Sequence, residues 1–147
     1  MTDKPKAKAK AKPKTEQKNY FSEKELRCKH SGEYFFDDDF LKLLNKIREE
    51  CGFPLRITSG YRSEQHPTEA RKIRFNKPAG SHNKGKAVDV GVTGEKALKL
   101  IEVAMNNGIT RIGINQKGDS RFIHLDVCKQ SDFPEIEHYP EVAIWSY

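Results

Sequence analysis

The sequence predicts an α+β domain: a small, mostly antiparallel sheet with two amphipathic helices packed on one face. Two stretches carry apolar residues at helical spacing and are followed by glycine, which is typical of helix ends. Four short segments have strand-like composition, some with alternating apolar residues. The chain of 147 residues has room for one such domain, since one hydrophobic core is typically built from about 100 to 150 residues.

Residues 1–19 are predicted to be a disordered tail outside this domain. They contain seven lysines against Asp3 and Glu16 and almost nothing apolar beyond alanine, so burial cannot offset the entropy cost of ordering them. The tail carries most of the formal charge of +6, and the nearly neutral remainder argues against a nucleic-acid-binding fold. Two interpretations of the tail stay open: a solvated extension, or an arm that contacts anionic polymers such as nucleic acid, teichoic acid or lipopolysaccharide.

Helices are expected to begin the domain. Ser22 and Glu25 have the spacing of a capping box, which predicts a short helix starting at Ser22. The first amphipathic helix is predicted from about Asp38 to Cys51, with Gly52 positioned to end it. Residues 54–58 are then predicted to form a brief strand.

A long polar and basic segment, Glu64 to Gly80, follows this strand. We expect it to be an excursion from the sheet with a helical turn near Thr68 to Ile73. Loops of this length in compact domains tend to be functional. His66 in this segment either lines a cleft or is simply exposed.

The second half of the chain alternates strand and helix. Lys86 to Val92 is predicted as a strand with its valines on one face and Asp89 on the other. Thr93 is positioned to cap the next helix, which Gly108 ends. The predicted buried stripe of this helix consists of Ala97, Leu98, Ile101, Ala104 and Met105.

Two further strands, Thr110 to Ile114 and Arg121 to Val127, are joined by a polar turn. Alternation in the last strand places His124 and Asp126 together on the face opposite its apolar residues. Residues 131–147 contain several aromatic side chains and are predicted to pack over the domain as a C-terminal segment.

Cysteine usage and hydropathy bear on where the chain is expected to work. Cys28, Cys51 and Cys128 are odd in number and widely spaced, which favours reduced thiols over a disulfide framework. No stretch approaches the roughly 20 apolar residues of a membrane helix, and the basic start lacks the apolar core of a secretory signal. The expectation is a protein made in soluble form in the cytoplasm, without a signal peptide.

His82, Asp89 and His124 are the candidate metal ligands. Two imidazoles and one carboxylate leave a fourth position for water, which is the ligand set of catalytic rather than structural zinc. Spacing alone does not separate this trio from histidines that are exposed or hydrogen-bonded for other reasons.

A resemblance strengthens the metal hypothesis. The pattern His82-x-x-Gly85-x-Ala87-x-Asp89, followed by a strand ending in His124-x-Asp126, resembles the zinc D-alanyl-D-alanine carboxypeptidase and endopeptidase family. That family shares its fold with the amino-terminal signalling domain of hedgehog proteins. The similarity extends upstream to the segment 57–63, where the family also has a strand, a glycine turn and an arginine.

The resemblance implies a zinc peptidase domain over residues 20–130, with His82, Asp89 and His124 as ligands of Zn2+. It also implies that Arg62 binds a substrate carbonyl or terminal carboxylate, a task that suits the fork of a guanidinium. Many members have an acidic residue three positions before the last histidine, where this chain has Arg121.

The departure at Arg121 leaves the general base open. Asp126 is the first candidate, since it shares a strand face with His124, although it can instead orient a metal ligand. Asp119 in the preceding turn is the second candidate.

The first functional hypothesis is a zinc-dependent peptidase that hydrolyses the peptide stem of bacterial peptidoglycan, as a D-Ala-D-Ala carboxypeptidase or an endopeptidase. Small members without a signal resemble bacteriophage lysis enzymes, which act on the cell wall, and a monomer is expected. The alternative is a non-catalytic zinc-binding recognition module of the same fold, and Arg121 favours it. A third hypothesis, nucleic-acid binding through the tail, has the least support.

Overall fold

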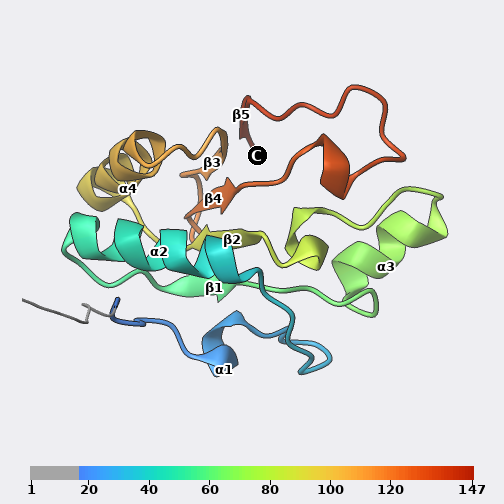
Figure 1. Ribbon diagram of the computed structural model, residues 1–147, viewed down its shortest axis with the longest axis horizontal. Coiled ribbons are helices and arrows are strands. Elements are labelled where there is room, and N and C mark those ends of the chain that lie inside the picture. Colours follow the sequence, from blue (N-terminus) through green and yellow to red (C-terminus); the bar gives the residue numbers. More distant parts are fainter. Residues whose placement is uncertain (1–16) are drawn as a thin grey trace, which may run out of the picture.

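The structure, a computed structural model, describes residues 17–147 and has the predicted α+β architecture. A five-stranded sheet runs through the molecule, with helices and connecting segments on both faces (Figure 1). Its helices are α1 (Glu23–Leu26), α2 (Asp38–Cys51), α3 (Pro67–Arg74), α4 (Gly94–Asn106) and the short 3-10 helices η1 (Ser81–Lys84) and η2 (Gln130–Asp132). Its strands are β1 (Ile57–Ser59), β2 (Ala87–Val90), β3 (Arg111–Asn115), β4 (Phe122–Asp126) and β5 (Ala143–Ser146).

The sheet has the order β1-β2-β4-β3-β5 and is antiparallel except for the pair β3 and β5. Its register places Asp89 of β2 opposite His124 of β4. His124 in turn faces Gly113 of β3, and Gly113 faces Trp145 of β5. Paired residues point to the same face of a sheet, so these four positions form one row across four strands.

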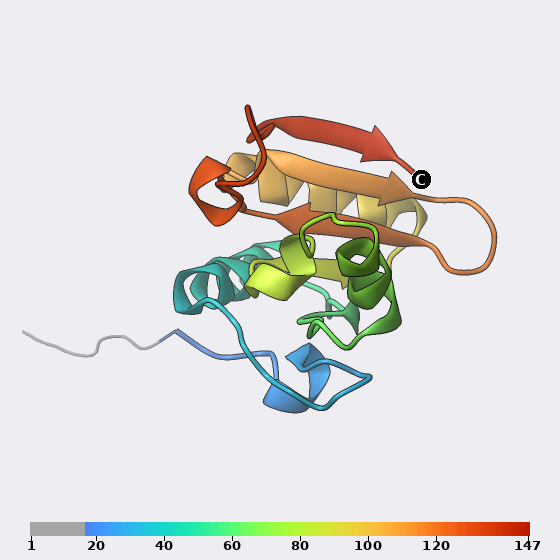
Figure 2. The same ribbon diagram turned by 90° about the vertical axis from the view of Figure 1, so that its right-hand side faces the viewer.

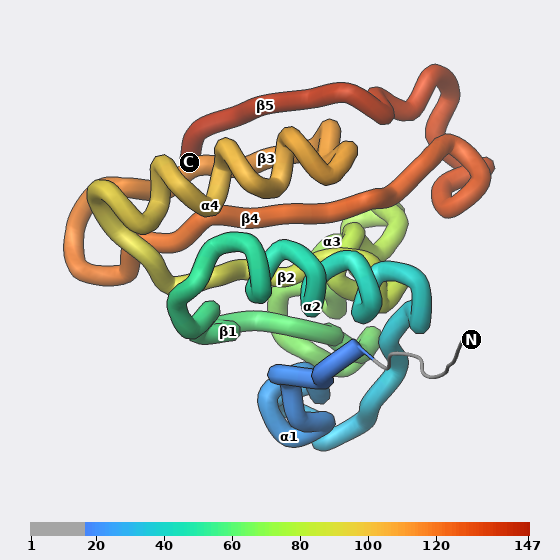
Figure 3. Tube along the Cα trace, turned by 60° about the vertical axis from the view of Figure 1, so that its left-hand side comes forward, coloured from blue at the N-terminus to red at the C-terminus, as the bar shows by residue number. Residues whose placement is uncertain are grey.

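The apolar core lies between the sheet and the pair α2 and α4, which run side by side over one face (Figure 3). Figure 2 shows α3 and η1 on the other face, which we call the site face. Alternation along β2 and β4 explains the division, because apolar residues at every second position turn toward the helices. The apolar core residues from these two strands and two helices are Val88, Val90, Ile123, Leu125, Phe40, Leu44, Ile47, Cys51, Ala97, Leu100, Val103 and Ala104.

The predicted buried stripe of α4 is correct for Ala97 and Ala104 but wrong for two of its larger residues. Leu98 and Met105 belong to the predicted buried stripe but are 70% and 60% exposed, whereas Leu100 is fully buried. The helix has apolar side chains around most of its circumference, so helical spacing alone allows more than one stripe. Packing against α2 selects the stripe that contains Leu100.

The N-terminal segment contacts the domain earlier than predicted. The Gln17 side chain donates a hydrogen bond to the carbonyl of Lys42, and the Asn19 side chain accepts one from Asn45 of α2. The capping box at Ser22 forms as predicted. Residues 1–16, which make up most of the predicted tail and its proposed anion contact, lie outside the described residues.

The polar excursion contains a full helix rather than one turn. α3 begins after His66, whose Nδ1 accepts a hydrogen bond from the backbone N–H of Thr68 and so caps the helix. In residues 17–147 no helix is long and apolar enough to cross a membrane. The three cysteines are buried and unpaired.

Candidate metal centre

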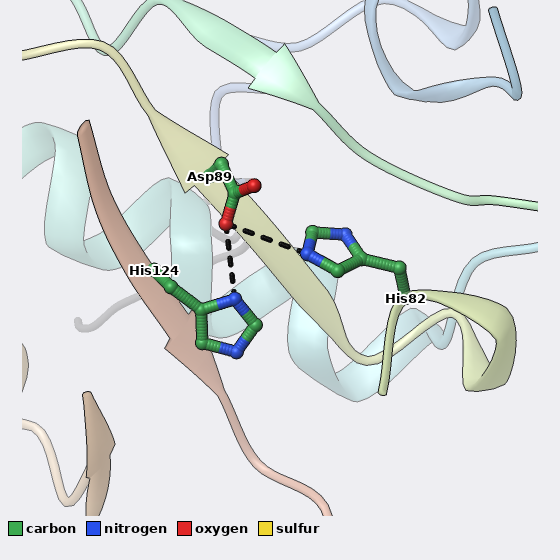
Figure 4. A group of neighbouring side chains, drawn as sticks. All are labelled: His82, Asp89 and His124. Carbon is green, nitrogen blue, oxygen red and sulfur yellow. Dashed lines mark hydrogen bonds and ion pairs between the residues drawn. The ribbon is translucent and has the colours of Figure 1, made fainter. Parts of the chain in front are cut away.

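Three side chains from separate elements meet on the site face (Figure 4). Asp89 projects from β2, His124 from β4, and His82 from η1. Oδ1 of Asp89 lies 3.0 Å from Nδ1 of His124 and 3.4 Å from Nε2 of His82. The donor atoms of the three residues all lie within 4.8 Å of one another, and all three residues are buried.

Hydrogen bonds determine which imidazole nitrogens face Asp89. Nδ1 of His82 lies 2.8 Å from the carbonyl oxygen of Gly60, which can only accept, so Nδ1 carries the proton and Nε2 presents a lone pair. Nε2 of His124 lies 2.7 Å from Oδ2 of Asp126, and in the neutral ring Nδ1 likewise presents a lone pair. Two lone pairs that face a carboxylate oxygen are stabilised by a shared cation, so this donor set fits a divalent metal such as zinc.

Burial and mutual contact shift the pKa values of these groups. Burial lowers the pKa of His82 more than its contact with Asp89 raises it, which keeps this imidazole neutral. Burial raises the pKa of Asp89, but its close contacts with the two imidazoles outweigh burial and hold that pKa below its usual range. Burial lowers the pKa of His124, but the two carboxylates beside it, Asp126 and Asp89, outweigh burial and raise that pKa.

Asp126 anchors His124 from the side away from Asp89. Its side chain is fully buried and accepts hydrogen bonds from His124, from Nε of Arg111 at 2.7 Å and from the backbone N–H of Cys128 at 3.0 Å. Arg111 also donates to the carbonyl of Pro140 and lies against the rings of Tyr139 and Trp145. The C-terminal segment thereby holds the anchor of a candidate ligand in place.

Two glycines allow the close approaches that shape the site. Gly85 ends η1 at a φ of 69°, and a Cβ there would lie 2.7 Å from the carbonyl oxygen of Phe35. A Cβ on Gly113 would lie 2.6 Å from Nε1 of Trp145. The missing side chain at Gly113 lets the Trp145 ring cross β3 and contact His124, with ring centroids 5.2 Å apart.

Arg62 joins the candidate metal centre to α3. Its Nε donates to Ser59 Oγ at 3.0 Å, Nη1 to Glu69 at 3.3 Å and Nη2 to Oδ2 of Asp89 at 3.5 Å. Glu69 is fully buried, and its other oxygen accepts the backbone N–H of Gly80 at 2.7 Å. Burial raises the pKa of Glu69, but the Gly80 N–H and the nearby cations outweigh burial and lower it. Glu69 therefore fixes the guanidinium and the loop before His82 together.

A cavity of about 690 Å³ opens over the three candidate ligands. Asp89 is the one carboxylate in its lining within residues 17–147. The walls come from the segment 77–82, from α3 and from the C-terminal segment, which contributes Phe133, Ile136, Tyr139, Trp145 and Tyr147. The candidate ligands thus lie at the bottom of a cleft large enough for part of a peptide.

The structure places His82, Asp89, His124 and Arg62 in the lining of one cleft. It does not bring the two base candidates there. Asp126 is enclosed by its three hydrogen-bond donors, and Asp119 borders a separate depression beside Arg56 and Arg121. His66 caps α3 and is not among the residues that line the cleft.

Sequence reasoning missed Glu69 and the role of the aromatic C-terminal segment. Glu69 stands in a polar segment without a clear hydrophobic periodicity. Only its contacts in the folded structure, with Arg62 and Gly80, distinguish it from exposed glutamates. The aromatic residues were predicted to pack over the domain, but their alignment with His124 depends on the parallel pairing of β5 with β3. The absence of a side chain at Gly113 was the available signal for that alignment.

Comparison with known proteins gives one family. A family model described as Peptidase M15 matches residues 19–126, most of the chain. The matched range contains the three candidate ligands and Arg62. None of the curated proteins matches.

Proposed function

Because the chain belongs to the Peptidase M15 family of zinc peptidases, we propose that it hydrolyses the peptide stem of bacterial peptidoglycan, as a D-Ala-D-Ala carboxypeptidase or an endopeptidase. The observation that supports this most directly is the convergence of His82, Asp89 and His124 at the bottom of a cleft. We further propose residues 20–130 as the peptidase domain, with residues 131–147 supplying one wall of its cleft. With this substrate, the protein would act on the cell wall.

In this proposal Nε2 of His82, Oδ1 of Asp89 and Nδ1 of His124 hold the metal. Bound zinc lowers the pKa of a water ligand toward 7 and polarises a carbonyl oxygen, which is the chemistry of metal-assisted hydrolysis. The chain prepares its ligands for this by fixing their tautomers: Gly60 accepts the proton of His82, and Asp126 that of His124. Neither histidine then needs to reorient when the metal binds.

Arg62 is proposed to bind the substrate. Its three contacts use one N–H on each nitrogen, which leaves one N–H on Nη1 and one on Nη2 for a carbonyl oxygen or a carboxylate. The side chain is only partly buried and lines the cleft beside Asp89. A guanidinium held at this place orients a substrate oxygen toward the metal position.

Asp126 is proposed as a positioning residue rather than as the general base. A base must reach the substrate or its attacking water, whereas Asp126 is buried behind His124 and already accepts three hydrogen bonds. Carboxylates that hold a ligating histidine in this way raise metal affinity. No other acidic residue within 17–147 lines the cleft, so Asp89 is the one carboxylate available near the reacting groups.

The proposed function is tested by metal content and hydrolysis together. Purified protein is expected to contain about one zinc per chain and to release D-alanine or stem peptide from peptidoglycan. A chelator should remove both, and added zinc should restore both. Zinc without hydrolysis of any wall peptide would instead favour the recognition module of the same fold, and absence of bound metal would refute the peptidase proposal.

Asp126→Asn is expected to weaken zinc binding by about 10- to 100-fold. The amide loses the negative charge that pairs with Arg111 and favours the required tautomer of His124. The measurement is competition for zinc against a chelator of known affinity. Asp119→Asn is the matched control, since Asp119 lies outside the cleft, and its zinc affinity should equal that of the unaltered protein. If Asp126→Asn kept full zinc affinity but lost hydrolysis, Asp126 would be the base after all.

A further inference from the structure

We infer that the cleft continues into a cationic groove along α3 that binds carboxylates of an acidic peptide substrate. This inference rests on the proposed function, because it takes the occupant of the groove to be the far end of the peptide that lies over the metal. It adds a substrate preference to that function: peptides with acidic groups remote from the scissile bond should bind better than their neutral counterparts.

Two adjoining cavities form the continuous groove. The first, over the candidate metal ligands, has a volume of about 690 Å³, and the second, along α3, of about 740 Å³. Thr68, Lys72 and Lys77 line both cavities, so they mark the junction. A ligand that extends from the metal position along these three shared residues would enter the second cavity.

Four cationic side chains line the second cavity: Arg71, Lys72, Arg74 and Lys77. Among the described residues, no acidic residue lines it. Lys72 has an acidic neighbour in Glu69 at 3.4 Å, but the same oxygen of Glu69 already accepts the Gly80 N–H. Within residues 17–147, no ion pair is formed by Arg71, Arg74 or Lys77. This concentration of unpaired positive charge lies in a domain that is nearly neutral as a whole.

Charge complementarity identifies the occupant as anionic, and continuity with the cleft identifies it as a peptide. Arg62 lines the first cavity and offers N–H donors to a carbonyl or carboxylate there, so one extended chain can contact Arg62, then Lys72 at the junction, then the arginines of the second cavity. Partly exposed charge pairs contribute modestly, about two- to fivefold in affinity for each pair, and salt screens them. The groove is therefore expected to set preference among substrates rather than to determine whether hydrolysis occurs.

Trp145 provides a direct test, because it is the single tryptophan of the chain and lines the first cavity. The probe is a stem pentapeptide ending in D-Ala-D-Ala, compared with the same peptide whose internal carboxyl groups are converted to amides. Stopped-flow tryptophan fluorescence of the zinc-containing protein gives the dissociation constant of each before turnover. We expect the acidic peptide to bind about tenfold more tightly at low salt, with the difference shrinking as salt is raised.

The double variant Arg71→Gln and Arg74→Gln changes two residues that line only the second cavity. It should remove most of this preference while leaving zinc content and binding of the amidated peptide unchanged. Lys46→Gln is the matched control, since Lys46 is exposed on α2, on the other face of the sheet, and it should keep the full preference. Equal binding of the two peptides, or a preference that survives in the double variant, would overturn the inference. If hydrolysis continued while the two peptides bound equally, the groove inference would be refuted and the proposed function would stand. If binding depended on charge but no peptide were hydrolysed, the proposed function would be refuted and the groove inference would stand.

Discussion

Replacing His82 or His124 with alanine is expected to remove bound zinc and to lower hydrolysis by roughly 10³-fold or more, since metal assistance to acyl transfer is worth several kcal/mol. Each variant leaves two of the three protein ligands, too few for the set expected of a catalytic zinc site. Both measurements belong to the same samples: zinc by elemental analysis, and D-alanine or peptide release from peptidoglycan.

The fold should survive these substitutions, so the loss can be assigned to the site. Both histidines lie on the site face, whereas the core forms on the other face between the sheet and the helices α2 and α4. Circular dichroism should therefore remain close to that of the unaltered protein. His138→Ala is a suitable control, because His138 is exposed in the C-terminal segment. Zinc retained at full stoichiometry in His82→Ala or His124→Ala would contradict the assignment of ligands.

The part of the fold that follows from local periodicity could be predicted from the sequence. Alternation in β2 and β4 places Asp89 and His124 on the face opposite their apolar neighbours, and antiparallel pairing then puts them side by side. The helix α2 follows from its stripe and from Gly52 at its end. Each of these features depends on residues within one element or one strand pair, where spacing is informative.

Features that depend on contacts between distant segments could not be predicted in the same way. The predicted buried stripe of α4 includes Leu98 in place of Leu100, because helical spacing allows either residue to face the core until packing against α2 selects one of them. The role of Glu69 could not be predicted from the sequence, because it depends on contacts with Arg62 and Gly80 that form only in the folded chain. The position of Asp126 behind His124 illustrates the same limit, since strand alternation gives the face of a residue but not the partners that enclose it.

Arg62→Ala is expected to lower kcat/KM for peptide hydrolysis by about 10²- to 10³-fold with zinc content unchanged, as for loss of one oriented donor in acyl transfer. The zinc ligands remain, and Asp89 loses only a 3.5 Å contact from the guanidinium. Arg62→Lys should recover little of the activity, because a single ammonium cannot bridge Glu69 and Asp89 and still present a forked pair of donors.

The division of this effect between kcat and KM identifies the partner of Arg62. A fall in kcat alone would mean that the guanidinium stabilises charge developing on the scissile carbonyl, whereas a rise in KM alone would mean that it binds a carboxylate already present in the substrate. Arg121→Ala is the matched control, since Arg121 is exposed and hydrogen-bonds to Gly118 beside a separate depression. If Arg62→Ala hydrolysed peptidoglycan as fast as the Arg121→Ala control, the contacts of Arg62 with Glu69 and Asp89 would be structural, and the substrate oxygen would have to be held by another residue of the cleft.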